Sequence, residues 1–317
     1  MFIEKLAAAA LAAVVAFVGV APTADAAIYT QTLPSGCTAP TLSGTTLNCN
    51  GSPLFTIVDY PCASQLVLGL QDGAYVVSCA TPNHTGLYWV PAESGQGYTL
   101  THQANTIFLL AYVYGSDHAA QWLSMLAKLD DTGRYVGEVL MSTGEPGNPF
   151  PHYVSQGSLT PNADGTIQLM MGSMNKTLRR FDFADGTPLP TCQFGAAPAS
   201  IATGLWWNPS QSGAGFGIHD QGGHLFLTWY SYDVAGNPRW GSAFMTSSAP
   251  NAYTGQIYST TGPTFSDASF DPASVVATSI GTATLTIADS TNATFSVGTM
   301  TIPLSRFTFA TPGTACH

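Results

Sequence analysis

The chain has 317 residues, of which 8 are Lys or Arg and 18 are Asp or Glu, so its formal net charge is −10. This acidic balance, with no basic cluster, excludes nucleic acid and anionic membrane surfaces from the expected partners. Charged residues make up only 8% of the chain, which leaves few groups for acid–base chemistry, and the length suits two or three domains.

The N-terminal segment has the features of a secretory leader. An apolar run over residues 6–20 follows Lys5, and the motif A-D-A that ends at Ala26 matches a leader-peptidase site. We therefore predict a signal peptide over residues 1–26, cleaved near Ala26, and a bacterial protein that is secreted, periplasmic or held at the cell surface. No later segment reaches the roughly 18 apolar residues of a membrane-spanning helix, so no transmembrane segment is predicted.

Residues 27–80 contain short β-rich runs separated by Gly, Pro and Ser, together with four of the six cysteines. A segment of this length builds only a small core, and an even number of cysteines in an exported chain indicates disulfides. We predict a small disulfide-braced β module here, and no zinc site because no C-x-x-C pair occurs. The sequence leaves the pairing of the cysteines open. They are Cys37, Cys49, Cys62, Cys79, Cys192 and Cys316.

The rest of the chain is a tandem duplication. Residues 86–122 align with residues 204–240 without a gap, at an offset of 118 residues, and each copy is later closed by a cysteine. A repeat of this size is a domain rather than a solenoid unit, so we predict one domain over residues 86–192 and a second over residues 204–316. The shared residues include the pairs Trp89/Trp207, Pro91/Pro209, Ser94/Ser212, Gly95/Gly213, Tyr112/Tyr230 and Trp122/Trp240.

Each copy is predicted to form an antiparallel meander of strands. Runs of β-branched and aromatic residues are separated by Asp, Asn and Gly turn signals. The runs recur about every 8–12 residues, which is the spacing of strands in all-β folds. No segment keeps a helical period. The expected fold class is therefore all-β, with two tandem antiparallel up-and-down barrels, or barrel-like sandwiches, preceded by the small β module.

The strand predicted at residues 224–232 is apolar on both faces. One face fills the core of its own unit, and the other face must be covered by the other unit, by another chain or by a ligand. The first face carries Leu225, Leu227 and Trp229, and the second carries Phe226, Tyr230 and Tyr232.

Each copy resembles the calycin barrels, the group of the lipocalins and avidins. The second copy opens with the motif G-L-W that ends at Trp206, and it carries Arg306 on its last predicted strand. In calycins such an Arg stacks on the first-strand Trp and plugs one end of the barrel. Arg180 occupies the matching place in the first copy, where Tyr88 replaces the Trp.

The second copy is also similar to the avidin opening, in which an Asn and a Ser four positions later bind the polar head of the ligand. Asn208 and Ser212 have that spacing, and the resemblance implies a pocket for a small apolar or aromatic ligand. The residues that would line it are Trp206, Asn208, Ser212, Tyr230 and Trp240. The weaker counterparts in the first copy are Trp89, Ser94, Tyr112 and Trp122, with Val90 at the position of the Asn.

The whole unit further resembles exported proteobacterial proteins with W-N-P-x-x-S-G-x-G repeats, a likeness that implies no particular activity. The same stretch also has a purely structural interpretation. Pro91 and Pro209 end strand pairing, and Gly95 and Gly213 permit a positive φ. On that interpretation, both copies keep these residues for folding.

No catalytic motif is found, because the chain lacks the G-x-S-x-G nucleophile elbow, the H-E-x-x-H motif and the P-loop. The one local cluster of His and carboxylate, His219 and Asp220 with His224, is predicted to lie at a surface turn. We therefore expect no catalytic residue, no metal ligand and no cofactor.

The leading hypothesis is a non-catalytic binding or interaction protein of the cell surface or extracellular space, with a protein or glycan partner or with itself as partner. A carrier of a small ligand in the second copy is the alternative hypothesis. A secreted hydrolase that uses His219 and Asp220 is a third.

Overall fold

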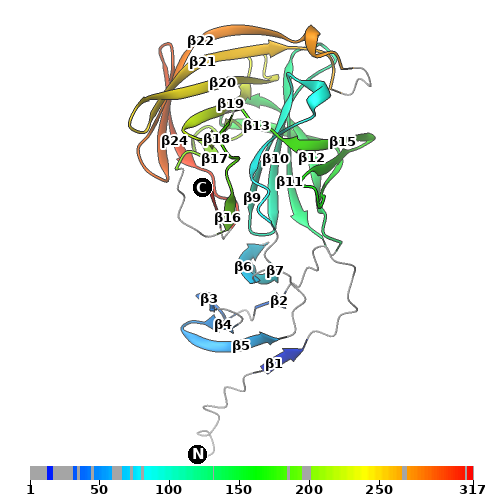
Figure 1. Ribbon diagram of the computed structural model, residues 1–317, viewed down its shortest axis with the longest axis vertical. Coiled ribbons are helices and arrows are strands. Elements are labelled where there is room, and N and C mark those ends of the chain that lie inside the picture. The colour runs from blue at the N-terminus through cyan, green and yellow to red at the C-terminus, as the bar shows by residue number, and fades with distance from the viewer. Residues whose placement is uncertain are drawn as a thin grey trace, which may run out of the picture.

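The computed structural model is all-β, with two closed eight-stranded barrels that follow small N-terminal sheets (Figure 1). This architecture confirms the predicted fold class and selects barrels over sandwiches. Most of the predicted leader and Cys62 lie outside the residues that the structure describes. The described residues are 13–16, 31–33, 36–43, 46–58, 66–71, 74–79, 82–130, 132–183, 186–194, 201–265, 270–310 and 313–316.

Two small sheets precede the barrels and lie below them in Figure 1. Their strands are β1 (Ala13–Ala16), β2 (Gln31–Thr32), β3 (Pro40–Ser43), β4 (Thr46–Cys49), β5 (Ser52–Val58), β6 (Leu66–Gln71) and β7 (Ala74–Cys79). One sheet has the order β1-β5-β4-β3, and the other has the order β2-β7-β6. A disulfide between Cys37 and Cys49 joins the segment before β3 to the end of β4, so the expected disulfide-braced module is present.

The first barrel is an up-and-down meander in which each strand pairs with the next and the last strand closes on the first. Its strands are β8 (Gly86–Trp89), β9 (Gly97–Gln103), β10 (Thr106–Tyr114), β11 (Ala120–Leu129), β12 (Tyr135–Glu145), β13 (Asn148–Pro161), β14 (Ile167–Met171) and β15 (Met174–Arg180). Closure pairs Arg179 with Trp89 and Arg180 with Tyr88. A short 3-10 helix, η1 (Pro91–Glu93), follows β8.

The second barrel has the same strand order. Its strands are β17 (Gly204–Trp207), β18 (Gly215–Gln221), β19 (His224–Tyr232), β20 (Pro238–Ala249), β21 (Ala252–Thr261), β22 (Val276–Ile287), β23 (Asn292–Val297) and β24 (Met300–Arg306). Closure pairs Trp206 with Arg306 and Trp207 with Ser305. The 3-10 helix η2 (Pro272–Ser274) precedes β22.

Side chains fill the interiors of both barrels. Alternate residues of each strand point inward, and they pack into one buried cluster per barrel. Tyr98 and Tyr135 are fully buried in the first barrel, and Trp206 and Phe295 are fully buried in the second. The guanidinium carbon of Arg306 lies 4.4 Å from the ring centroid of Trp206, so this end of the second barrel is closed by a cation–π contact.

A third buried cluster joins the two barrels. The second apolar face of β19 is covered by the first barrel, which is one of the three alternatives that the sequence left open. The matching face of β10 is covered by the second barrel in the same way. The cluster contains Leu110, Tyr112, Tyr114, Ala120 and Trp122 of the first barrel and Leu205, Tyr230 and Trp240 of the second.

A two-stranded ribbon connects the segments that follow the barrels. Strand β16 (Cys192–Phe194) pairs antiparallel with β25 (Thr314–Cys316), and Cys192 and Cys316 stand opposite each other in a disulfide. The sequence separation of these two cysteines is 124 residues. The bond therefore encloses the entire second barrel in a covalent loop, which restricts the unfolded chain strongly.

We expect the double variant Cys192→Ser/Cys316→Ser to lower the free energy of unfolding of the paired barrels by about 2–5 kcal/mol, because a long loop loses its constraint. Urea denaturation followed by tryptophan fluorescence would measure this change. The matched variant Cys37→Ser/Cys49→Ser lies outside both barrels and should leave the barrel transition in place. Equal midpoints for the first variant and the unmodified chain would contradict the assignment.

Candidate functional site

The Ser-Gly loops that the sequence marks as candidate ligand openings lie in contacts between the barrels. Gly213 has a φ of +81°, and a methyl group there would lie 2.5 Å from Cβ of Pro149 in the first barrel. Gly95 has a φ of +109°, and a methyl group there would lie 2.6 Å from a methyl of Val275 in the second barrel. Each glycine is thus required twice, by its backbone conformation and by the close approach of the other barrel.

Two hairpin extensions make these contacts. We call residues 140–154 of β12 and β13 the first arm, and residues 258–265 and 270–280 around the β21–β22 connection the second arm. The first arm donates a hydrogen bond from Gly144 N to Gly236 O, 2.9 Å away in the second barrel. The second arm donates the equivalent bond from Gly262 N to His118 O of the first barrel, at 3.0 Å. Donors and acceptors of the two bonds are each related by the offset of 118 residues. The barrels therefore contact each other as two halves of a pseudo-two-fold dimer.

The two matched tryptophans make equivalent hydrogen bonds across this contact. Trp122 Nε1 donates to the carbonyl oxygen of Ser231, and Trp240 Nε1 donates to that of Val113, both at 2.9 Å. The ring of Trp122 packs on Tyr230, with centroids 5.4 Å apart. Tyr230 and Trp240, which the avidin likeness placed in a ligand pocket, are thus buried between the barrels.

The remaining candidates of the second copy lie elsewhere. Trp206 is inside the second barrel, where its Nε1 donates to the carbonyl oxygen of Ala202 at 2.8 Å. The side-chain oxygen of Asn208 accepts from the backbone N and the hydroxyl of Ser210 at 3.0 and 2.8 Å, which closes a turn. The carbonyl oxygen of Ser212 accepts from Gly147 of the first arm at 2.9 Å. The structure therefore does not bring the five candidates together around one cavity.

The first-copy counterparts are similarly divided. Trp89 points away from the barrel interior and packs against Phe181, with ring centroids 5.0 Å apart. Ser94 ends the 3-10 helix η1 that Pro91 begins. The hydroxyl of Tyr112 accepts a hydrogen bond from Thr228 Oγ1 of the second barrel at 2.6 Å. In this copy too, the candidates serve the loop and the contact between the barrels.

Each nitrogen of the Arg306 guanidinium donates a hydrogen bond to a backbone carbonyl oxygen. Its Nε and Nη1 donate to the carbonyl oxygens of Ser290 and Thr203 at 2.6 and 2.7 Å, and its Nη2 donates to Ile201. Burial lowers the pKa of Arg306 to about 10, so it stays charged at neutral pH over Trp206. Arg306 thus covers Trp206 and links the last strand of the barrel to the segments before β17 and β23.

Arg180, at the matching place in the first barrel, donates from Nη2 to the carbonyl oxygen of Thr85 at 3.0 Å. Tyr88 takes the inward position of the second-barrel Trp206 and is buried, and burial raises its pKa to about 12.

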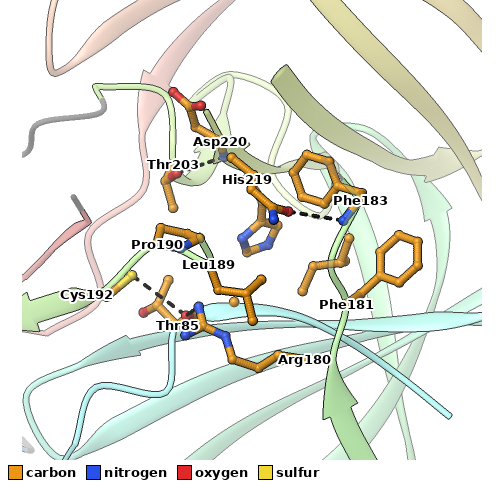
Figure 2. A pocket seen from close by; sticks show the side chains of 13 residues that line it. Thr85, Arg180, Phe181, Phe183, Leu189, Pro190, Cys192, Thr203, His219 and Asp220 are labelled. Carbon is orange, nitrogen blue, oxygen red and sulfur yellow. Dashed lines mark hydrogen bonds between the residues drawn. The ribbon is translucent and has the colours of Figure 1, made fainter. Parts of the chain in front are cut away.

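Two matched clefts lie where the start of each barrel meets the other barrel. The first has a volume of about 10 Å³, and it is lined by Arg180, Leu189, His219 and Asp220 among others (Figure 2). The second has a volume of about 70 Å³ and is lined by Arg306 and Thr101 at the matching positions. Small-molecule sites usually have volumes of about 300–1,000 Å³, so these clefts suit ordered water.

His219 lies in strand β18 and is buried, so the prediction of a surface turn at this residue is wrong. The turn is formed by Gly222 and Gly223, both with positive φ, which leaves His219 within the paired part of the strand. Figure 2 shows the ring of His219 pointing into the first cleft and the carboxylate of Asp220 pointing away from it. Adjacent strand residues face opposite sides, so the two do not form an acid–base pair.

The environment of His219 favours its neutral form. Burial, and secondarily the charge of Arg180, lowers the pKa of His219 to about 3. Its Nε2 has no hydrogen-bond partner among the described residues. His219 is thus a buried, neutral imidazole.

A second histidine pair, in which His102 is buried and His84 is half-buried, was not predicted from the sequence. The rings of His84 and His102 stack with centroids 5.5 Å apart, and Tyr135 Oη lies 3.1 Å from His102 Nε2. Burial, and secondarily Arg180, lowers the pKa of His84 to about 4. Burial, and then His84, lowers the pKa of His102 well below its ordinary value. The only sequence signal was a His within a β-rich run, which does not distinguish a buried site from an exposed one.

Among the described residues, no group of three or more His, Cys, Asp or Glu side chains is placed to hold a metal ion. Within the same ranges, no helix is long and apolar enough to cross a membrane. No protein-family model, curated protein or solved structure matches the chain.

We expect Gly213→Ala to destabilise the paired barrels by several kcal/mol, since the new methyl would add a clash with Pro149 to the cost of a positive φ. Gly165→Ala is the matched control, because Gly165 has a φ of +82° and open space around it. That control should cost only about 1–2 kcal/mol. Thermal unfolding of both variants would measure the difference, and equal losses would show that the contact between the barrels adds nothing.

We expect the free energy of unfolding to fall as the pH drops from 6.5 towards 4. His84, His102 and His219 have lowered pKa values in the folded chain, so the unfolded chain binds more protons in this window. The lost stability is recovered above pH 6.5, where both states are neutral. Each histidine contributes a slope of at most about 1.4 kcal/mol per pH unit.

Urea denaturation across this pH range would measure the slope. His219→Phe removes one titrating group and keeps an aromatic ring, so it should flatten the slope by about one proton. Val234→Ala changes an exposed residue that does not titrate, so it is the control and should leave the slope in place. An unchanged slope in His219→Phe would contradict the neutral, buried state of His219.

Proposed function

We propose that this chain is an exported, non-catalytic interaction protein that binds a macromolecular partner through the arms of its paired barrels. The observation that carries the proposal is the exposure of the arms. Residues 150–154 of β13 are consecutively exposed, which means that neither face of this part of the strand is covered. A strand with one buried face would alternate between buried and exposed residues.

The exposed side chains are of the kind that anchors protein and glycan contacts. Phe150 is 56% exposed and Tyr153 is 59% exposed on the first arm. Aromatic residues are enriched in interface cores, because they bury a large area with little loss of side-chain entropy. A protein surface or the apolar face of a sugar would each suit such an edge.

The internal use of polar groups further supports an interaction protein over a carrier or a hydrolase. Asn208, Tyr230 and Trp240, the groups that a carrier would offer to a ligand, are engaged in turns and in the contact between the barrels. The clefts of about 10 and 70 Å³ are far below the size of a ligand pocket. We therefore prefer the interaction hypothesis.

The disulfides are consistent with an extracellular or periplasmic protein. Export through the predicted leader, with cleavage near Ala26, is part of the proposal. The exposed residues 150–154 of the first arm would be accessible to a partner on the cell envelope.

The double variant Phe150→Ala/Tyr153→Ala should bind the envelope fraction of the native cell at least about tenfold more weakly than the unmodified chain, a loss of roughly 1.4 kcal/mol or more. Co-sedimentation with the envelope at increasing protein concentration would measure the affinity. Val234→Ala is the control, because Val234 is exposed and lies in a turn outside the arms. The proposal fails if the unmodified chain does not sediment with the envelope, or if the double variant binds equally well.

A further inference from the structure

Strand β22 extends beyond the strand that follows it. β21 pairs with β22 along residues 276–286, whereas β23 pairs only with residues 283–287. Residues 276–282 therefore have β21 on one side and, within the described part of the chain, no strand on the other. We call this segment the open edge. In Figure 1, β22 runs along the outer margin of the second barrel.

The open edge is exposed on both faces. Residues 276–280 are all exposed, and Val276 and Ile280 are 58% and 47% exposed. Backbone N–H and C=O groups on such an edge are available to another strand, and natural proteins usually protect them with proline, charge or a covering element.

The first barrel has a comparable edge and protects it with proline. β14 pairs with β13 only along residues 157–161, so residues 148–156 lack a strand on that side within the described part of the chain. Pro149 and Pro151 lie in this stretch and cannot donate backbone hydrogen bonds.

The second barrel carries Val275 and Ala277 at the matching positions. Pro151 pairs with Ser142, and Ala277 pairs with Thr260. Ser142 and Thr260 are counterparts at the offset of 118 residues, so Pro151 and Ala277 occupy matching positions. Pro149 and Val275 match as well, because each covers the Ser-Gly loop of the other barrel. The same molecule thus has a protected edge and an unprotected copy of it.

The sequence of the open edge suits pairing with an identical strand. Residues 272–288 contain no charged side chain, although the whole chain has a net charge of −10. Pairing of two identical strands brings like residues close together, so any charge in the segment would repel its own copy. The segment is also rich in Val, Ile and Thr, which favour strands.

We propose that the open edge pairs antiparallel with the open edge of a second copy of this chain. A two-fold axis makes such an edge its own complement, because antiparallel copies offer each other matching donors and acceptors. The register shift that leaves Ile280 as a bulge limits the regular part of the edge to residues 276–279. The dimer is accordingly weak and concentration-dependent. This inference rests on the interaction function proposed above and names one partner for it.

Sedimentation velocity of the full chain over a concentration series tests the pairing. The unmodified chain should dimerise with a midpoint of about 10–100 μM, as expected of a small interface. Ala277→Pro copies the proline of the first barrel into the matching position and should weaken dimerisation at least about tenfold. Pro151 shows that this position accepts proline, so the fold should be retained, which circular dichroism would check.

Ala277→Lys serves as a second variant that keeps the backbone N–H and adds a charge, and it should also give monomers. Val234→Lys places the same charge in an exposed turn outside both arms and should leave dimerisation unchanged. The pairing is overturned if the unmodified chain stays monomeric throughout the series, or if both Ala277 variants dimerise as it does. A monomeric chain that still binds the envelope through Phe150 and Tyr153 would overturn self-pairing alone and leave the proposed function standing.

Discussion

The burial of the second apolar face of β10 and β19 is the constraint on which the rest of this molecule depends. A barrel strand normally has one face in the core and one in water, but these strands are apolar on both faces. Each barrel alone would expose a patch that contains Tyr112 or Tyr230 together with a tryptophan. Packing the barrels against each other removes both patches from water at once. The reciprocal bonds of Trp122 and Trp240 then fix the relative orientation of the barrels.

Several otherwise separate features follow from this contact. The Ser-Gly loops need glycine because the arm of the other barrel lies against them, with Val275 on Gly95 and Pro149 on Gly213. The segments after the barrels converge, which brings Cys192 and Cys316 into a disulfide. The duplicated chain thus behaves as a dimer whose two subunits are covalently linked, with an interface related by pseudo-two-fold symmetry.

The two barrels have nevertheless diverged inside and outside. In the first barrel, Glu93 and Lys176 form an ion pair at 2.5 Å with little exposure. In the second barrel, Gln211 replaces the glutamate, and the interior around Trp206 is apolar. A partly buried ion pair of this kind gives less net stability than its short distance suggests, because both charges lose hydration. The surface of the paired barrels matters more for function, because residues 150–154 and 276–280 of the arms remain exposed. The proposed functions therefore rest on the arms.

The sequence by itself determined the strand content, the duplication and the all-β class, because these depend on local periodicity and on composition. It left barrels and sandwiches open, and the stack of Arg306 on Trp206 was expected only from the resemblance to calycin barrels. Tertiary structure alone decided what covers the Ser-Gly loops. The contact of Gly95 with Val275 joins residues far apart in the chain, and no periodic pattern encodes which distant segment arrives there. His219 was misplaced for a related reason: the turn that begins three residues later was visible in the sequence, but the residues of the first unit that cover His219, such as Arg180 and Leu189, were not. Local rules specify strands, whereas the docking of two finished barrels specifies which surface residues disappear and which remain available.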